Sequence, residues 1–260
     1  MHNSKKGYLP MEVKHELSNE MCASTPEEVA YMKKVPYVSA VGSIMYVVRC
    51  TRPDVAFAQN LVSRYQQNPG KLHWVAVKHI LKYLRNTRDM FLVYGGKPDT
   101  ELNVTGFCDA SWQCDKDDTK SQTGYVFVVN GGAVDWKSKK QTTIAMSATQ
   151  AEYMAASEAA MEAVWIRKFV GDLGVMPSIK EFVFCIMYCD NSAAIIFAKD
   201  SGIMKGARHF LRRYHFVREQ VESGEIKILK VHTDDNLADL FTKALPRGKV
   251  IILPMELDFN

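Results

Sequence analysis

The 260-residue chain lacks several features that would assign it at once to a class of protein. Its six cysteines form no C-x-x-C pair, the usual spacing of structural zinc ligands, so we expect no zinc. It has no apolar run of the roughly 18 residues that a membrane-spanning helix needs. Its start, "MHNSKKGYLP", is too polar for a secretory signal peptide. We therefore expect a soluble intracellular protein, cytoplasmic or nuclear, with reduced thiols and no membrane contact.

A strong excess of charge of one sign is also missing. The net charge is only +4, so any contact with an anionic polymer must come from local basic patches. Hydrophobic residues make up 47% of the chain and charged residues 24%, which is typical of a globular protein with a sizeable core.

The first part of the chain divides into a lead-in and a helical region. Residues 1–36 are polar and interrupted by prolines, which predicts a loosely structured lead-in. Residues 37–98 show helical spacing, with Thr51 placed to cap a helix that Asn68-Pro69-Gly70 ends. The helix predicted from residue 71 has one basic face, which includes Lys78, Lys82 and Arg85. This face indicates either an ordinary solvated surface or a surface that binds the phosphates of a nucleic acid.

The pattern changes to strands in residues 99–247. Three strands are predicted at 102–108, 123–129 and 133–137, and Asn130-Gly131-Gly132 joins the last two as a hairpin. A long helix at about 149–172 follows, and then strands alternate with helices, the last helix covering "NLADLFTKAL". This order predicts an α/β fold with a mixed sheet between helices. Residues 248–260 form a separate tail.

Four carboxylates stand where strands end or helices begin. Asp109 lies in the apolar run "VTGFCDASWQ" and Asp190 ends "FVFCIMYCD", while Glu152 and Asp239 lie in the first turns of predicted helices. Carboxyl ends of strands gather the ligand sites of such sheets. Oxygen ligands of this kind suit Mg²⁺, and two such ions can hydrolyse a phosphodiester.

Each of these carboxylates also has an ordinary structural explanation. Asp109 could begin a turn, and Asp190 could cap the helix that follows it. Glu152 completes a capping box with Thr149, although Ser147-x-x-Gln150 supplies another, and the helix dipole favours Asp239. Only the joint arrangement favours a metal site.

Several segments of the chain, in order, resemble the C-terminal part of copia-type retrotransposon polyproteins. The clearest are "VPYVSAVGSIMYVVRCTRPDVA", "NPGKLHWVAVKHILKYL", "GFCDASW", "SQTGYVFVVNGGAVDWKSKKQ", "SATQAEYMAASEAAMEAVWIRKF", "YCDNSAAI", "RYHFVRE" and "VHTDDNLADLFTKAL". The resemblance covers roughly residues 1–247. It implies the thumb and connection of a reverse transcriptase at 37–98, followed by an RNase H-like domain at 99–247 whose mixed sheet has five strands.

The resemblance also implies an activity and its residues. That family cleaves the RNA strand of RNA/DNA hybrids with two Mg²⁺ ions, for which Mn²⁺ is an alternative. The matching motifs place the metal ligands at Asp109, Glu152, Asp190 and Asp239, with Asp109 bridging both ions. The last match is the loosest, because Asp234 and Asp235 lie nearby. His232, in a predicted loop, either moves a proton or simply ends a strand.

Contacts to the substrate are expected from groups that reach the backbone, because hybrids are recognised by shape and by 2′-hydroxyls. The candidates form a lysine cluster after Trp136, two polar residues beside Glu152 and a second basic stretch: Lys137, Lys139, Lys140, Ser147, Gln150, Arg208, Arg212 and Arg213. The alternative for the basic residues is scattered charge that solubilises the surface.

The chain also departs from the family. It has no Tyr-x-Asp-Asp polymerase turn, no Asp-Ser/Thr-Gly of a protease and no His-His/Cys-Cys module of an integrase, and "RGKVIILPMELDFN" is unlike the family's tail. We therefore expect either a hybrid-specific ribonuclease, alone or beside the remaining reverse-transcriptase subdomains, in a cytoplasmic virus-like particle or the nucleus, or a silent remnant that keeps the fold and binds nucleic acid. A transposase-like strand-transfer enzyme would require a zinc-binding module that the chain lacks.

Overall fold

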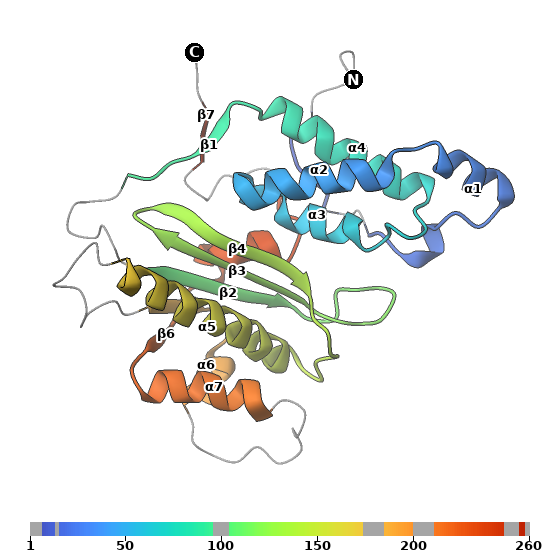
Figure 1. Cartoon of the computed structure of the whole chain (residues 1–260). Coiled ribbons are helices and arrows are strands. Elements are labelled where there is room, and N and C mark those ends of the chain that lie inside the picture. Colours follow the sequence, from blue (N-terminus) through green and yellow to red (C-terminus); the bar gives the residue numbers. More distant parts are fainter. Residues whose placement is uncertain are drawn as a thin grey trace.

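A five-stranded sheet lies between two layers of helices in the computed structural model of the chain, which describes residues 7–13, 16–95, 104–173, 185–199, 211–246 and 255–257. Helices α2 to α4 cover one face of the sheet and α5 to α7 the other (Figure 1). The predicted α/β class, with a mixed five-stranded sheet flanked by helices, is confirmed.

In its described residues, the first layer contains four α-helices and two short 3-10 helices. Their bounds are α1 Pro26–Lys33, α2 Tyr37–Cys50, α3 Ala56–Ser63, α4 Lys71–Asn86, η1 Asn19–Met21 and η2 Pro53–Val55. Helix α1 corrects the prediction of a loosely structured lead-in. Thr25 and Glu28 form a capping box around its first turn, where Pro26 needs no hydrogen bond, and Met32 is buried.

A buried ion pair fixes the turn between α2 and α3. Arg52 donates from Nε and Nη2 to the two carboxylate oxygens of Asp54, at 2.9 and 2.7 Å, and both side chains are almost fully buried. Tyr83 of α4 donates to the same carboxylate at 2.6 Å, and Thr87 accepts from Arg52. This network therefore ties the end of α4 to the turn.

The sheet has the order β4-β3-β2-β5-β6. Strand β2 pairs antiparallel with β3 and parallel with β5, so the meander β2–β4 continues into a parallel half. Asn130 and Gly131 have positive φ angles of 49° and 80°, as the tight hairpin between β3 and β4 requires. The strands run β2 Thr105–Ser111, β3 Gln122–Val129, β4 Gly132–Lys140, β5 Cys185–Cys189 and β6 Ile226–Lys230.

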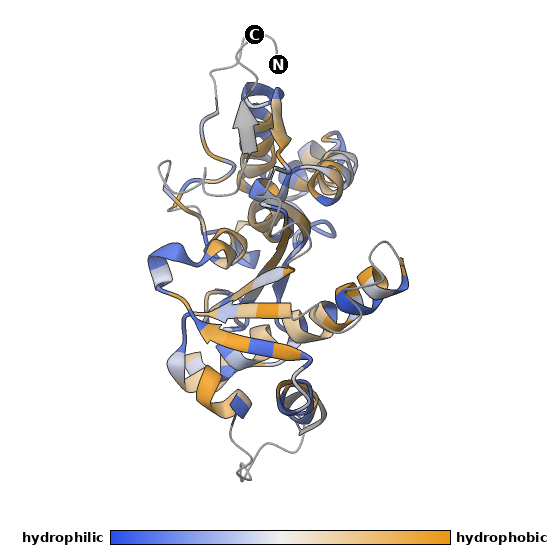
Figure 2. Ribbon diagram, turned by 90° about the vertical axis from the view of Figure 1, so that its left-hand side faces the viewer, coloured by the Kyte–Doolittle hydropathy of each residue, from blue (hydrophilic) through white to orange (hydrophobic). Residues whose placement is uncertain are grey.

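The second layer is formed by α5 Ala148–Asp172, α6 Ser192–Lys199 and α7 Leu211–Glu222. A run of buried alanines on α5, including Ala156, Ala159 and Ala163, lets this 25-residue helix lie close to the sheet. Figure 2 shows hydrophilic and hydrophobic residues along the outer helices, as expected where one face meets a core and the other meets solvent. Among the described residues, no helix is long and apolar enough to cross a membrane.

The predicted final helix over "NLADLFTKAL" is instead a 3-10 helix, η6 Leu237–Phe241, which follows η5 Thr233–Asp235. The Asn236 side chain caps it by accepting from Ala238 N at 3.1 Å. Thr242, just after the helix, donates from its hydroxyl to Asp239 O at 3.3 Å, and 3-10 helices are usually this short.

The two large hydrophobic cores lie on the two faces of the sheet. One joins buried residues of α2, α3 and α4 to Val126, Ala133 and Phe241, while the other joins the sheet to α5, α6 and α7. The helical region thus shares a core with the sheet. Strand β1 Met90–Leu92 pairs antiparallel with β7 Met255–Leu257, so part of the expected tail returns to the helical layer. The domain boundaries at 36, 98 and 247 stay a prediction.

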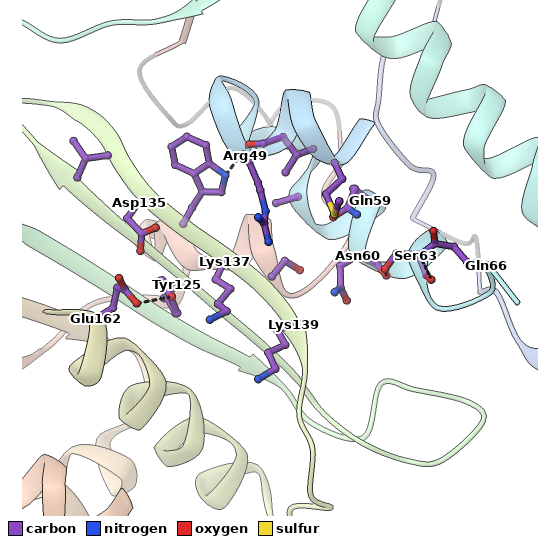
Figure 3. Close-up of a pocket in the computed structure, with 16 residues that line it drawn as sticks. Arg49, Gln59, Asn60, Ser63, Gln66, Tyr125, Asp135, Lys137, Lys139 and Glu162 are labelled. Carbon is purple, nitrogen blue, oxygen red and sulfur yellow. Dashed lines mark hydrogen bonds between the residues drawn. The ribbon is translucent and has the colours of Figure 1, made fainter. Parts of the chain in front are cut away.

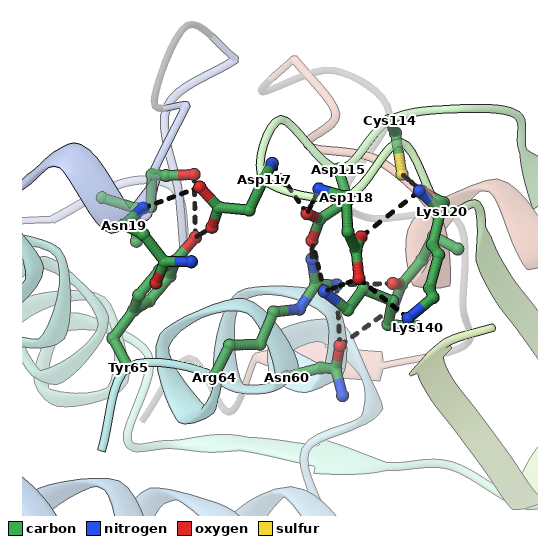
Figure 4. Close-up of polar contacts among 12 residues, drawn as sticks. Asn19, Asn60, Arg64, Tyr65, Cys114, Asp115, Asp117, Asp118, Lys120 and Lys140 are labelled. Atoms are coloured by element: carbon green, nitrogen blue, oxygen red, sulfur yellow. Dashed lines mark hydrogen bonds and ion pairs between the residues drawn. The ribbon is translucent and has the colours of Figure 1, made fainter. Parts of the chain in front are cut away.

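A polar network adds to this contact between layers (Figure 4). Arg64 at the end of α3 reaches Asp115, in the loop after β2, at 2.5 Å, and Gln122 of β3 at 2.6 Å. Lys140 at the end of β4 also contacts Asp115, at 3.1 Å. Because Asp115 and Gln122 are buried, these bonds satisfy groups that would otherwise lose their water.

Candidate active site

Asp109 lies near the carboxyl end of β2, on the face that η6 covers, and only 5% of its surface is exposed. It stands opposite Gly124 of β3. A Cβ at Gly124 would lie 2.7 Å from side-chain atoms of Phe241 and Thr242, so only glycine leaves room for η6 here. Thr242, thus held close, donates a hydrogen bond from its hydroxyl to Asp109 Oδ2.

Glu152 and Asp190 approach the same end of the sheet from two elements. Glu152 is the fifth residue of α5, just past its first turn, and Asp190 directly follows β5. Ligand atoms of Glu152, Asp190 and Cys189 all lie within 4.8 Å of one another. In the described part of the chain, Glu152 Oε2 is buried and has no hydrogen-bond partner.

Asp239 completes the group from η6, where it is 6% exposed. Lys243, four residues later, pairs with Asp239 Oδ1 at 2.7 Å. Burial alone would lower the pKa of Lys243, but its hydrogen bond to Asp239 and the charge of Asp109 outweigh that effect and raise it. Lys243 is therefore a cation at neutral pH.

Burial and neighbouring charges raise the pKa values of Asp109 and Glu152. Burial raises the pKa of Asp109 to about 6, aided by the charges of Asp239 and Asp190 and opposed by the Thr242 hydrogen bond and Lys243. Burial and the charge of Asp109 raise the pKa of Glu152 to about 10. Such an arrangement is costly for an ion-free protein, and a divalent cation would relieve it. The oxygen-rich donor set and the unpaired Glu152 Oε2 fit Mg²⁺ or Mn²⁺.

The chain is similar to known polyproteins along most of its length. The chain is 45% identical over 249 residues, 96% of its length, to the retrovirus-related Pol polyprotein from transposon TNT 1-94 of Nicotiana tabacum. It is 36% identical over 213 residues to that from transposon RE2 of Arabidopsis thaliana. The chain belongs to the copia-type retrotransposon Pol polyproteins. This copia-type chain spans 18% and 14% of the length of those two relatives.

No protein-family model matches the copia-type chain. Among solved structures, RNase H1 of Halobacterium salinarum covers 54% of this chain and 94% of its own, at 19% identity and a TM-score of 0.37.

His232, the fifth residue predicted for catalysis in this copia-type chain, lies at the surface. Its side chain is 74% exposed, and its Nδ1 accepts from Asp234 N at 3.3 Å while lying 3.7 Å from the Asp234 carboxylate. Its contacts are thus local, at the start of η5. Ser147 and Gln150 serve as caps of α5: Ser147 Oγ accepts from Gln150 N at 3.2 Å, and Gln150 Oε1 accepts from Met146 N at 2.8 Å.

The predicted basic contacts of the copia-type chain fall in different places. Lys140 is engaged with Asp115 and Asp118, at 3.1 and 3.0 Å. Lys137 lies over the ring of Tyr125, and Lys139 lies 3.9 Å from Glu158. Three others lie on α4, in the helical layer: Lys78, Lys82 and Arg85. Arg208 lies outside the described residues, and of Arg212 and Arg213 only the backbone in α7 is described.

A cleft of about 610 Å³ runs along the edge strand β4 (Figure 3). Helices α2 and α3 form one wall, which includes Arg49 and Asn60, and β4 contributes Lys137 and Lys139. At one end stands Asp135, whose pKa burial and the neighbouring Glu162 raise to about 6. The cleft therefore combines basic groups with amide and hydroxyl groups that can bind a phosphodiester backbone.

Reasoning from the sequence missed three residues that shape the copia-type site. Thr242 bonds to Asp109, Lys243 neutralises Asp239, and Asn236 donates from Nδ2 to Cys108 O at 3.0 Å, which fixes η6 on β2. The spacing of Lys243, four residues after Asp239, was a usable signal for an ion pair.

Proposed function

We propose that this chain is a Mg²⁺-dependent endonuclease that hydrolyses the RNA strand of RNA/DNA hybrids. The observation that carries the proposal is the grouping of Asp109, Glu152 and Asp190 at one end of the sheet, with Asp239 beside them. Glu152 is buried there and one of its oxygens lacks a partner, which is unfavourable unless a cation binds. Membership of the copia-type Pol family supports the same conclusion.

The residues of the site would have distinct roles in catalysis. Asp109, Glu152, Asp190 and Asp239 would hold the ions. Two Mg²⁺ ions, when bound, supply the Lewis acidity that activates a water and stabilises the departing 3′ oxygen. Thr242 holds one oxygen of Asp109, which leaves the other free to face the centre.

The position of Lys243 gives Asp239 a different role from the other acids. Its ammonium group lies 2.7 Å from Asp239 Oδ1 and so offsets the charge of an almost completely buried carboxylate. The same cation lies close enough to Asp109 to oppose the rise of its pKa. Lys243 therefore keeps the site partly neutralised before an ion arrives.

The substrate would be held by its backbone rather than by its bases. Lys137 and Lys139, with Arg49 across the cleft, offer charges at spacings along β4 that a phosphate chain can follow. Lys139 stands nearer the end of β4 that adjoins the carboxylates, because Lys139 and Thr123 are paired next to Gly124.

The decisive experiment is incubation of the purified chain with a labelled RNA/DNA hybrid and Mg²⁺. Asp109→Asn and Asp190→Asn are expected to lose at least about 100-fold in cleavage rate, in line with the loss of ligands from a metal site. Asp89→Asn, which changes an exposed carboxylate near β1, is the matched control and should cleave like the wild type. Equal cleavage in the two site variants would show the assignment to be wrong.

The same assay distinguishes the second candidate, a silent remnant that keeps the fold and binds nucleic acid. That candidate is supported if the folded wild-type chain retains hybrid in a gel-shift experiment but does not cleave it with either Mg²⁺ or Mn²⁺.

A further inference from the structure

Cys189 stands among the carboxylates, although a magnesium site has no use for sulphur. Its Sγ and carboxylate oxygens of Glu152 and Asp190 lie within 4.8 Å of one another. Mg²⁺ prefers oxygen ligands, whereas a thiolate selects softer ions such as Zn²⁺ and Cd²⁺. The last residue of β5 therefore changes the kinds of ion that this end of the sheet can hold.

The surroundings of Cys189 are those of a preformed ligand. The side chain is buried, and Asn191 N donates to its Sγ at 3.4 Å. Only 8% of the Glu152 surface is exposed, and its Oε2 has no hydrogen-bond partner in the described part of the chain. A buried carboxylate oxygen without a partner, beside a buried sulphur, is an independent sign that a cation belongs there.

We propose that Cys189, Glu152 and Asp190 form a binding site for a thiophilic divalent cation, Zn²⁺ or Cd²⁺, and that this ion excludes Mg²⁺ from the centre. On binding, the Cys189 S–H bond breaks, its proton passes to solvent, and the sulphur bonds to the ion without any change of oxidation state. Three protein ligands and one water complete a four-coordinate zinc site. This site differs from the C-x-x-C zinc modules that the sequence lacks.

The inhibitory half of this inference rests on the proposed function, because it assumes that Mg²⁺ uses Glu152 and Asp190. The binding half does not. A retrotransposon nuclease built in this way would respond to the supply of free zinc, since occupation by zinc and by magnesium would compete for two shared carboxylates.

The test is a titration of the full, metal-free chain with Cd²⁺ in a non-thiol reductant, followed by the ultraviolet charge-transfer absorption of a cadmium–thiolate bond. Cys189→Ser should lose this band and at least about tenfold in affinity for Cd²⁺. Cys185→Ser is the matched control, because Cys185 is buried on the same strand and the same face, four residues away, and it should behave like the wild type.

A second variant tests the same ligand set if Cys189→Ser folds poorly. Glu152→Gln retains the thiol but removes one ligand, and it should weaken Cd²⁺ binding about tenfold while circular dichroism stays unchanged. Unchanged affinity in Glu152→Gln overturns the proposed ligand set. So does a band that persists in Cys189→Ser but disappears in Cys108→Ser, since Cys108 is the partner of Cys189 on the adjacent strand.

Hybrid cleavage provides the separate test of competition. Micromolar Zn²⁺ should inhibit wild-type cleavage in Mg²⁺, and additional Mg²⁺ should restore it. Cd²⁺ binding at Cys189 without any hybrid cleavage would support the proposed metal site and refute the nuclease proposal. Hybrid cleavage that is insensitive to Zn²⁺ would support the nuclease proposal and refute the competition between Zn²⁺ and Mg²⁺.

Discussion

Replacing Glu152 by glutamine should stabilise the metal-free protein while it removes a metal ligand. The carboxyl group of Glu152 is buried, and its pKa rises from 4.5 to about 10 because burial and the charge of Asp109 disfavour the ionised form. The folded chain therefore retains a proton that the unfolded chain releases. The free energy of unfolding must fall as the pH rises from about 4.5 toward about 10.

The expected magnitude follows from this window. Each pH unit between the two pKa values costs about 1.36 kcal/mol, so at about pH 8 the ceiling for Glu152 is roughly 5 kcal/mol. Asp109 and Asp190 share the same repulsion and relax when one proton is bound, so we expect roughly 2–3 kcal/mol. Glutamine keeps the size of the side chain but has no charge to bury, and thus recovers this free energy.

The measurement is urea-induced unfolding in EDTA at about pH 5 and about pH 8, for wild type and Glu152→Gln. The variant should gain little at the lower pH and roughly 2–3 kcal/mol at the higher pH. Added Mg²⁺ should reduce or reverse the difference, because the ion binds the wild-type carboxylate. Glu219→Gln, on the exposed side of α7, is the control and should show no such dependence on pH. A variant that is less stable than the wild type at both pH values would refute the reasoning.

Three further changes test other parts of the structure. Gly124→Ala places a methyl group against η6 and should cost about 1–3 kcal/mol in urea unfolding, with hybrid cleavage reduced as well; wild-type stability would contradict the contact. Asp54→Asn removes the partner of buried Arg52 and should cost about 3–5 kcal/mol, whereas a loss below about 1 kcal/mol would mean that the network is dispensable. Replacing Lys137 and Lys139 together by glutamine should weaken hybrid binding and lower its salt dependence by about two charges, so an unchanged slope would remove the cleft from the substrate path.

Much of the sheet could be predicted because its signals are local. Alternating apolar residues and the Asn-Gly-Gly turn predict β3 and β4 within two or three residues of their ends. The first layer was harder: α1 depends on the Thr25–Glu28 capping box, which the surrounding prolines conceal. Helical spacing also predicted an α-helix over η6, where tertiary contacts favour a shorter 3-10 turn.

In the candidate site, too, only the features with local sequence signals could be predicted. Motifs place Asp109, Glu152, Asp190 and Asp239 in the chain, but only the fold determines their distances. Thr242 lies 133 residues from Asp109, and no local pattern connects them. Its position results from the absence of a side chain at Gly124, which packing alone reveals.

The core shared between α2–α4 and the sheet has a consequence for how this molecule can be divided. Trp136 of β4 donates to Val48 O of α2 at 3.0 Å, and Arg64 joins α3 to Asp115 and Gln122. Cutting the chain at the predicted boundary near residue 98 would expose this apolar face and remove the Arg64 contacts of the buried Asp115 and Gln122. We therefore expect the sheet to be stable only together with its helical cover, and recombination that separates the two should yield an insoluble product.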